Sequence, residues 1–154
     1  MPEKVYFDTC ALNRLTDDQS QLRIREESEA ITRILDLVTD GDLSWTGSNL
    51  LRAELRQNPD VDSREIAMAY LELASEFAIP ESETYERALI LESKGFGSFD
   101  AIHLALAEKA GVEWLFTVDD RFLNKASKHP ENLRPVVINP LDWIRRRQPW
   151  LLKR

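Results

Sequence analysis

Two aspartates stand directly behind short β-prone runs of the chain. Asp8 comes after residues 5–7, and Asp119 lies two residues past the run 114–117. Either carboxylate alone is most simply explained as a turn former or a helix cap, because aspartate favours both positions. Together at strand ends, they supply the hard oxygen ligands that Mg²⁺ and Mn²⁺ prefer.

Two further acids lie where apolar side chains are expected. Asp100 heads the segment 100–107, which is apolar on nearly every side and is therefore predicted to be buried. Glu54 follows Leu50 by four residues and Leu51 by three, so it shares the apolar face of its predicted helix. A helix-dipole role for Asp100 and a salt bridge for Glu54 are the plain alternatives. In each case a buried carboxylate needs a partner, because an unpaired buried charge is costly.

Four carboxylates at one place would repel one another unless a cation joined them. Mg²⁺ and Mn²⁺ bind hard oxygens, keep several waters and are completed by substrate phosphates. A carboxylate cluster that holds such a metal is the usual apparatus for phosphodiester hydrolysis. The four acids therefore predict a metal-dependent phosphodiesterase site, provided that the fold brings them together.

Strands and helices alternate along the chain that must position these acids. Strands are predicted at residues 5–7, 43–46, 114–117 and 136–138, and helices at 21–39, 48–58, 63–77, between Pro80 and Gly95, at 99–109 with Ser98 as its cap, from Asp119, and at 140–147. This alternation predicts an α/β protein with a mainly parallel sheet, in which sites form beyond the carboxyl ends of the strands. The length of 154 residues fits one domain, which we place at residues 1–147 with a basic tail at 148–154.

Composition and charge exclude several classes of protein. The only cysteine is Cys10, which rules out an intramolecular disulfide and argues against structural zinc. No apolar run approaches the roughly 20 residues of a membrane helix, and the N-terminus has no signal-peptide pattern, so a cytoplasmic protein is expected. The net charge is −7, but residues 121–154 hold nine basic and two acidic side chains, which keeps a polyanionic partner open.

In order and spacing, the acidic motifs resemble those of the PIN-domain nucleases. The motifs are Val-Tyr-Phe-Asp8-Thr9, Ser48 with Glu54-Leu55, Asp100-Ala-Ile-His-Leu-Ala-x-Ala107 and Thr117-Val-Asp119-Asp-Arg-Phe122, and the four acids are 46, 46 and 19 residues apart. The resemblance extends from Val5 to Asn139-Pro140. One departure is Arg121, which stands where the family often has another aspartate.

The resemblance implies a three-layer α/β/α fold around a central, mainly parallel sheet of four or five strands. It implies a Mg²⁺- or Mn²⁺-dependent endoribonuclease, often the toxin of a VapBC-type toxin–antitoxin pair. By position, the catalytic and metal-binding residues are Asp8, Glu54, Asp100 and Asp119, with Thr9, Thr117 and Asp120 in support. A non-catalytic PIN-like scaffold that binds RNA or protein is the alternative. A haloacid-dehalogenase-type phosphatase is disfavoured, because Cys10 replaces the second acid of its Asp-x-Asp motif.

Other residues receive weaker assignments. Arg14, Arg52, Arg121 and Lys125, with Lys128, are candidates for gripping the RNA backbone because they neighbour the acidic motifs. Residues 145–147 with Trp143 and Trp150 are candidates for contacts with RNA, a second subunit or an antitoxin. His103 and Cys10 are interpreted as packing residues. The expected partners are an RNA substrate, a second copy in a homodimer and an antitoxin protein, with no membrane.

Overall fold

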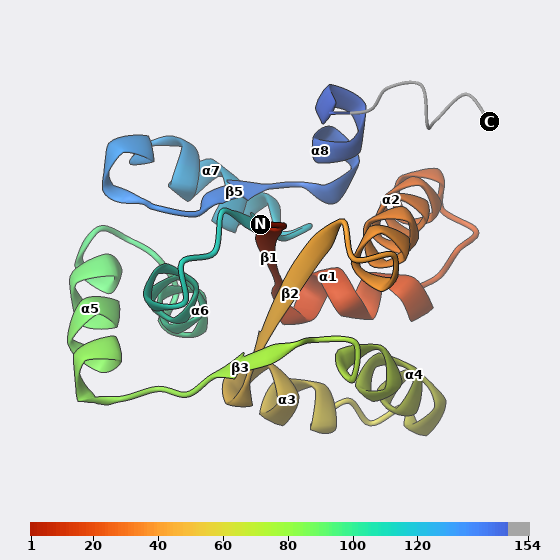
Figure 1. Ribbon diagram of the computed structural model, residues 1–154, viewed down its shortest axis with the longest axis horizontal. Helices are drawn as coiled ribbons and strands as arrows, with labels where there is room; N and C mark the ends of the chain where they lie inside the picture. Colours follow the sequence, from red (N-terminus) through yellow and green to blue (C-terminus); the bar gives the residue numbers. More distant parts are fainter. Residues whose placement is uncertain (148–154) are drawn as a thin grey trace.

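A parallel β-sheet forms the middle of the molecule (Figure 1). Its strands are β1 (Glu3–Phe7), β2 (Leu43–Ser48), β3 (Glu76–Ala78), β4 (Trp114–Phe116) and β5 (Val136–Ile138). They lie in the order β3-β2-β1-β4-β5, and all four neighbouring pairs are parallel. The mainly parallel sheet expected from the alternating sequence is confirmed.

The helices connect these strands in a computed structural model that describes residues 1–147. They are α1 (Thr9–Asn13), α2 (Leu22–Thr39), α3 (Asn49–Arg56), α4 (Val61–Leu71), α5 (Ser82–Ser93), α6 (Ser98–Lys109), α7 (Asp120–Ser127) and α8 (Pro140–Arg147), with 3₁₀ turns η1 (Arg14–Thr16) and η2 (Pro130–Asn132). The predicted tail at 148–154, including Trp150, lies outside the described residues. No helix among the described residues is long and apolar enough to cross a membrane.

Two apolar cores lie on opposite faces of the sheet, because successive residues of a strand point to opposite sides. Val5 and Phe7 pack with residues of α1, α2, α3, α4 and α8. Tyr6, between them, packs instead with residues of α5, α6 and α7. Figure 1 shows α5 and α6 side by side on one flank and α1 and α2 on the other. The three-layer α/β/α architecture is therefore confirmed.

One predicted element is wrong. The helix expected at residues 63–77 ends at Leu71, and the short edge strand β3 follows, with its Ser48–Ala78 pair at the end of β2. The helical spacing of apolar residues runs on through Phe77, which concealed the change. The helix buries Ala67 and Leu71, while Ile66 is exposed.

The strand order reverses beside β1, which places a topological switch point in the sheet. The chain moves outward from β1 through β2 to β3, and then returns to place β4 on the other side of β1. In parallel α/β sheets, ligands bind beyond the carboxyl ends of the strands at such a point. A ligand site is therefore expected among the residues that follow β1 and β4.

Candidate active site

Asp8 begins the candidate site, directly after the central strand β1. As the N-cap of α1, its Oδ1 accepts the N–H of Ala11 at 3.0 Å. Cys10 donates its thiol hydrogen to the same oxygen at 3.2 Å. Asp8 is only 4% exposed, and this burial raises the pKa of its carboxyl by disfavouring the charged form.

Asp119 lies after the adjacent strand β4 and is the N-cap of α7. Its Oδ1 accepts the N–H of Arg121 at 2.9 Å, and its own N–H donates to Thr117 Oγ1 at 3.1 Å. Thr117 is fully buried, and its hydroxyl lies 3.3 Å from the Cys10 sulfur. Thr117 and Cys10 therefore connect the turn after β4 to the turn after β1.

Asp100 occupies the first turn of α6, whose N-cap is Gly97 rather than the predicted Ser98. The side chain is half-buried rather than fully buried, and it lines an open pocket of about 560 Å³ together with Asp119. Burial raises the pKa of Asp100 to about 6, with further contributions from the charges of Asp8 and Asp119. The three aspartates are thus within electrostatic reach of one another.

Glu54, on α3, is held through a single oxygen. The Thr9 hydroxyl donates to Oε1 at 2.8 Å, and His103 Nε2 lies 2.6 Å from the same atom. Burial on its own raises the pKa of Glu54, but hydrogen bonding and charge from His103, together with Thr9, outweigh burial and lower it. His103 is thus the partner of Glu54, and the sequence did not indicate it.

A buried hydrogen-bonded chain lies behind that contact. His103 Nδ1 is 2.5 Å from the Tyr6 hydroxyl, which is 2.7 Å from Ser48 Oγ. Ser48 caps α3 and accepts the N–H of Leu51 at 3.0 Å. His103 is buried, as the sequence predicted, but its ring also makes specific polar contacts that packing alone does not require.

The donor chemistry of the three aspartates suits a divalent cation. Hard carboxylate oxygens are the ligands that Mg²⁺ and Mn²⁺ select, and capping occupies only Oδ1 of Asp119. Within residues 1–147, no three His, Cys, Asp or Glu side chains form a complete metal-binding group. Mg²⁺ usually retains several waters and takes only one or two protein carboxylates, so the residues present fit this ion without a full protein cage.

Residues 5–128 match the sequence pattern of the family described as PIN domain, and the match includes all four acids. The chain belongs to the PIN domain family. Members of this family are nucleases. The resemblance found in the acidic motifs is therefore confirmed.

Solved structures share the fold of this PIN domain. VapC20 of Mycobacterium tuberculosis, described as a sarcin-ricin loop cleaving toxin, aligns with a TM-score of 0.56 and 17% identity, over 77% of this chain and 92% of that one. PAE2754 of Pyrobaculum aerophilum aligns with a TM-score of 0.52 and 18% identity, over 95% of this chain and 97% of that one. No curated protein matches the chain in sequence.

Basic residues of α7 and its C-cap line the same pocket as Asp100 and Asp119. They are Arg121, Lys125 and Lys128. Lys125 lies across Gly95, where a Cβ atom would come within 2.8 Å of the ammonium nitrogen. Gly95 also has a φ of +103°, a conformation that other residues rarely adopt, so it favours both the turn and the close approach of this lysine.

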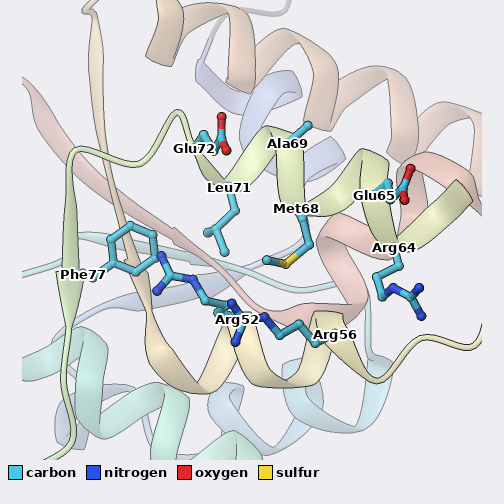
Figure 2. Close-up of a pocket in the computed structure, with 9 residues that line it drawn as sticks. All are labelled: Arg52, Arg56, Arg64, Glu65, Met68, Ala69, Leu71, Glu72 and Phe77. Carbon is cyan, nitrogen blue, oxygen red and sulfur yellow. The ribbon is translucent and has the colours of Figure 1, made fainter. Parts of the chain in front are cut away.

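Two other candidates for RNA contacts lie elsewhere in the PIN domain. Arg14 pairs with the buried Glu27 at 2.9 Å and with Asp17 at 3.1 Å. Arg52 lies in a different pocket, of about 730 Å³, with its guanidinium 4.3 Å from the centre of the Phe77 ring (Figure 2). We call this second pocket the arginine groove, after Arg52, Arg56 and Arg64.

Asp120, the acid adjacent to Asp119, is bound to α2. Its carboxylate pairs with Arg23 at 2.8 Å, and Arg23 also donates to the carbonyl of Val118 at 3.2 Å. The hydrogen bond and charge of Arg23 lower the pKa of Asp120. The side chain therefore secures the start of α7, in whose first turn it lies.

Four site-supporting residues were not predicted to have polar roles: Tyr6, Ser48, Cys10 and His103. Weak signals for three of them were present in the sequence. Tyr6 places a hydroxyl in a run with period-two alternation, so its polar end has to be satisfied inside the core. Ser48 stands at a helix start, and His103 follows Asp100 by three residues on the same helix face. None of these signals indicates that the residues meet.

Proposed function

We propose that this PIN domain is a Mg²⁺- or Mn²⁺-dependent endoribonuclease and the toxin of a VapBC-type toxin–antitoxin pair. The observation that supports it best is that Asp100 and Asp119 line one open pocket, beside Asp8 and Glu54. Burial first, and then the charges of Asp8, Asp119 and Glu54, raise the pKa of Asp100 to about 6. A protein has little structural reason to keep such a cluster, whereas a cation that binds it relieves the repulsion. The acids lie at the switch point of the sheet, where the fold places ligands.

The proposed chemistry divides among the residues of the chain. A bound divalent ion supplies Lewis-acid polarisation of the phosphate and lowers the pKa of bound water. Asp8, Asp100 and Asp119 would hold it directly or through water, with Glu54 orienting the attacking water or binding a second ion. Capping hydrogen bonds at Ala11 and Arg121 fix two of these carboxylates before substrate arrives.

Recognition of RNA is proposed for the basic edge of the pocket. Arg121, Lys125 and Lys128 lie beside Asp100 and Asp119, so their charges can neutralise phosphates next to the scissile bond. Arg121 occupies the position where the family often has another acid, which gives this site more positive charge. An RNA substrate would place the enzyme in the cytoplasm.

The toxin assignment is supported by the fold shared with VapC20. If it is right, expression of the wild-type protein halts bacterial growth and expression of Asp100→Asn does not. Co-expression of a cognate antitoxin should restore growth with the wild-type enzyme. Growth arrest that is equal in both proteins would reject the toxin assignment.

A homodimer is proposed from apolar residues that the monomer leaves exposed. Ile66 and Leu73 are exposed near α4, and Tyr85, Leu89 and Ile90 are exposed on α5. Burying such residues against a second copy is favourable, and symmetric dimers are the commonest oligomers. A sedimentation mass near 17.8 kDa at micromolar concentration would contradict this proposal.

A direct assay separates the nuclease from the scaffold alternative. Purified protein is incubated with structured RNA in Mn²⁺, in Mg²⁺ and in a chelator, with a small phosphate ester as a second substrate. The proposal predicts cleavage of RNA that needs the metal and returns when metal is restored. RNA binding without cleavage in either metal would favour the scaffold.

A further inference from the structure

The buried chain that ends at Glu54 runs through the sheet and links two helices. It starts at Ser48, at the end of β2, passes Tyr6 in the central strand β1, and reaches His103 on α6. All three residues are buried, so their polar atoms have no access to bulk water. The terminal contact, from His103 Nε2 to Glu54, is 2.6 Å long.

One direction of donation satisfies every hydrogen of the chain. The backbone N–H of Leu51 donates to Ser48, whose hydroxyl then donates to Tyr6. The Tyr6 hydroxyl donates to His103 Nδ1, and Nε2–H donates to Glu54 Oε1. In the opposite direction the hydroxyl hydrogen of Ser48 would have no acceptor within residues 1–147, which is costly for a buried group.

The consequence for Glu54 is that its two oxygens are not equivalent. His103 and Thr9 both bind Oε1, whereas Oε2 has no hydrogen bond within the described residues. The side chain is 24% exposed, and its charge contributes to the raised pKa of Asp100. Oε2 is therefore the oxygen left free for a further contact.

We propose that His103 and Tyr6 are positioning residues that hold Glu54 with Oε2 available for the reaction. This inference rests on the proposed nuclease function and assigns a role to residues outside the acidic quartet. His103 acts through Glu54: it fixes the carboxylate rotamer through Oε1, as partners behind metal-site and catalytic side chains commonly do. Tyr6 in turn fixes the tautomer and the orientation of the imidazole.

The first test compares two substitutions of similar size at His103. His103→Leu removes both nitrogens, and we expect kcat to fall about 10- to 100-fold with KM nearly unchanged. His103→Gln keeps an N–H close to the position of Nε2 and should restore most of the loss. Equal activity in both variants, or a loss confined to KM, would overturn the positioning role.

The second test is a double-mutant cycle, which separates action through Glu54 from a general effect on the fold. In a Glu54→Gln background, His103→Leu should lower kcat little further, because the carboxylate that it positions is already gone. Tyr6→Phe, which loses only the hydroxyl, should show the same dependence on Glu54. Losses that multiply independently in the double variants would mean that His103 and Tyr6 are merely structural.

A third readout needs neither metal nor activity. The Nε2–H proton of His103 in the metal-free protein should resonate far downfield in the NMR spectrum, as expected for a short buried hydrogen bond. Both Glu54→Gln and Tyr6→Phe should shift this signal, whereas Thr46→Val, at a buried hydroxyl bonded to Glu76 instead, should not. A signal unchanged in Glu54→Gln would refute the contact. If the wild-type protein cleaves no RNA, the proposed function fails while this measurement still decides whether the chain holds Glu54.

Discussion

Helix α3 separates two polar regions that are built in opposite ways. On one side, the charge of Glu54 acts on Asp100, in the group of acids near the ends of β1 and β4, while on the other Arg52 and Arg56 line the arginine groove (Figure 2). In the acidic region, carboxylate oxygens accept hydrogen bonds from helix N-termini or buried side chains. The groove is instead lined by long side chains over the apolar Met68, Leu71 and Phe77.

The arginines of the groove are held much more loosely than the acids. Arg52 stacks on the Phe77 ring, and Arg64 donates to the carbonyl of Asn58 at 3.1 Å. Within residues 1–147, none of the three groove arginines makes an ion pair, whereas Arg14 and Arg23 do. Catalysis depends on groups fixed in advance, so this difference supports our proposal that the chemistry takes place among the acids and not in the groove.

The largest effect is expected from neutralising one aspartate of the candidate site. Asp8→Asn or Asp100→Asn should lower metal-dependent RNA cleavage by at least about 100-fold, because each loses a charge that holds the ion. Asparagine is also a good helix cap, so the start of α1 is retained in Asp8→Asn. Initial rates in saturating Mn²⁺ provide the measurement.

Asp62→Asn is the matched control, because Asp62 is an exposed acid in the first turn of α4 as Asp100 is a half-buried acid in the first turn of α6. It should cleave RNA at the wild-type rate. Asp100→Asn at the wild-type rate would instead make Asp100 a residue that only complements its helix dipole.

The second prediction concerns which arginines and lysines bind RNA. Arg121→Ala and Lys125→Ala should each weaken RNA affinity and reduce the slope of log K against log salt by about 1, because each removes one phosphate contact. Arg56→Ala and Arg64→Ala remove the same charge from the groove and should leave that slope unchanged. Salt titrations by fluorescence anisotropy, in chelator to prevent cleavage, compare the four variants. Equal effects in both pairs would mean that the groove also binds the RNA backbone.

The sequence predicted the fold well where the residues of a single strand or helix form a recognisable local pattern. The strand at residues 5–7 and the helices around it follow from short periodic patterns, and Asp8 and Asp119 follow from positions at strand ends. Strand β3 was not predicted, because it is a three-residue edge strand that pairs only with β2. Its apolar residues also continue a spacing that is typical of a helix.

Contacts that join distant segments could not be predicted in the same way. The hydrogen bond between Tyr6 and His103 spans 97 positions of the chain, and the one between His103 and Glu54 spans 49. A tyrosine in a strand and a histidine in a helix can both lie on an apolar face, so neither Tyr6 nor His103 indicates in the sequence that it needs the other as a partner. Only the packing of α6 and α3 against β1 brings the three side chains together.

The third prediction tests whether the acids repel one another in the metal-free protein. A raised pKa for Asp100 means that folding favours its protonated form. Its contribution to stability is fully present below the unfolded value of about 4 and is lost as pH rises through about 6. At pH 7, Asp100→Asn should therefore raise the Tm of the metal-free protein by about 2 to 6 °C.

Metal should counteract the stability advantage of Asp100→Asn over the wild-type protein. Mn²⁺ binds the native state and should raise the Tm of the wild-type protein more than that of Asp100→Asn. Melts in chelator and in Mn²⁺, at pH 5 and pH 7, give the four comparisons. If Asp100→Asn is the less stable protein in chelator and gains as much from Mn²⁺ as the wild type, then Asp100 is a structural residue and does not share a metal site with the other acids.

The smallest expected effect lies in the arginine groove and concerns stability alone. Arg52→Ala loses the guanidinium 4.3 Å from the centre of the Phe77 ring, so the free energy of unfolding should fall by about 0.5 to 1 kcal/mol. Arg56→Ala, on the same helix but without a ring, hydrogen-bond or ion-pair contact of its guanidinium within residues 1–147, should change it by less. Urea titrations measure the difference between the two variants.

Repeating both substitutions in a Phe77→Leu background should abolish that difference, because the ring is then absent. If the difference persists, Arg52 stabilises the groove through its aliphatic stem over the apolar residues beneath it, and the contrast with the hydrogen-bonded acids on the other side of α3 becomes sharper still.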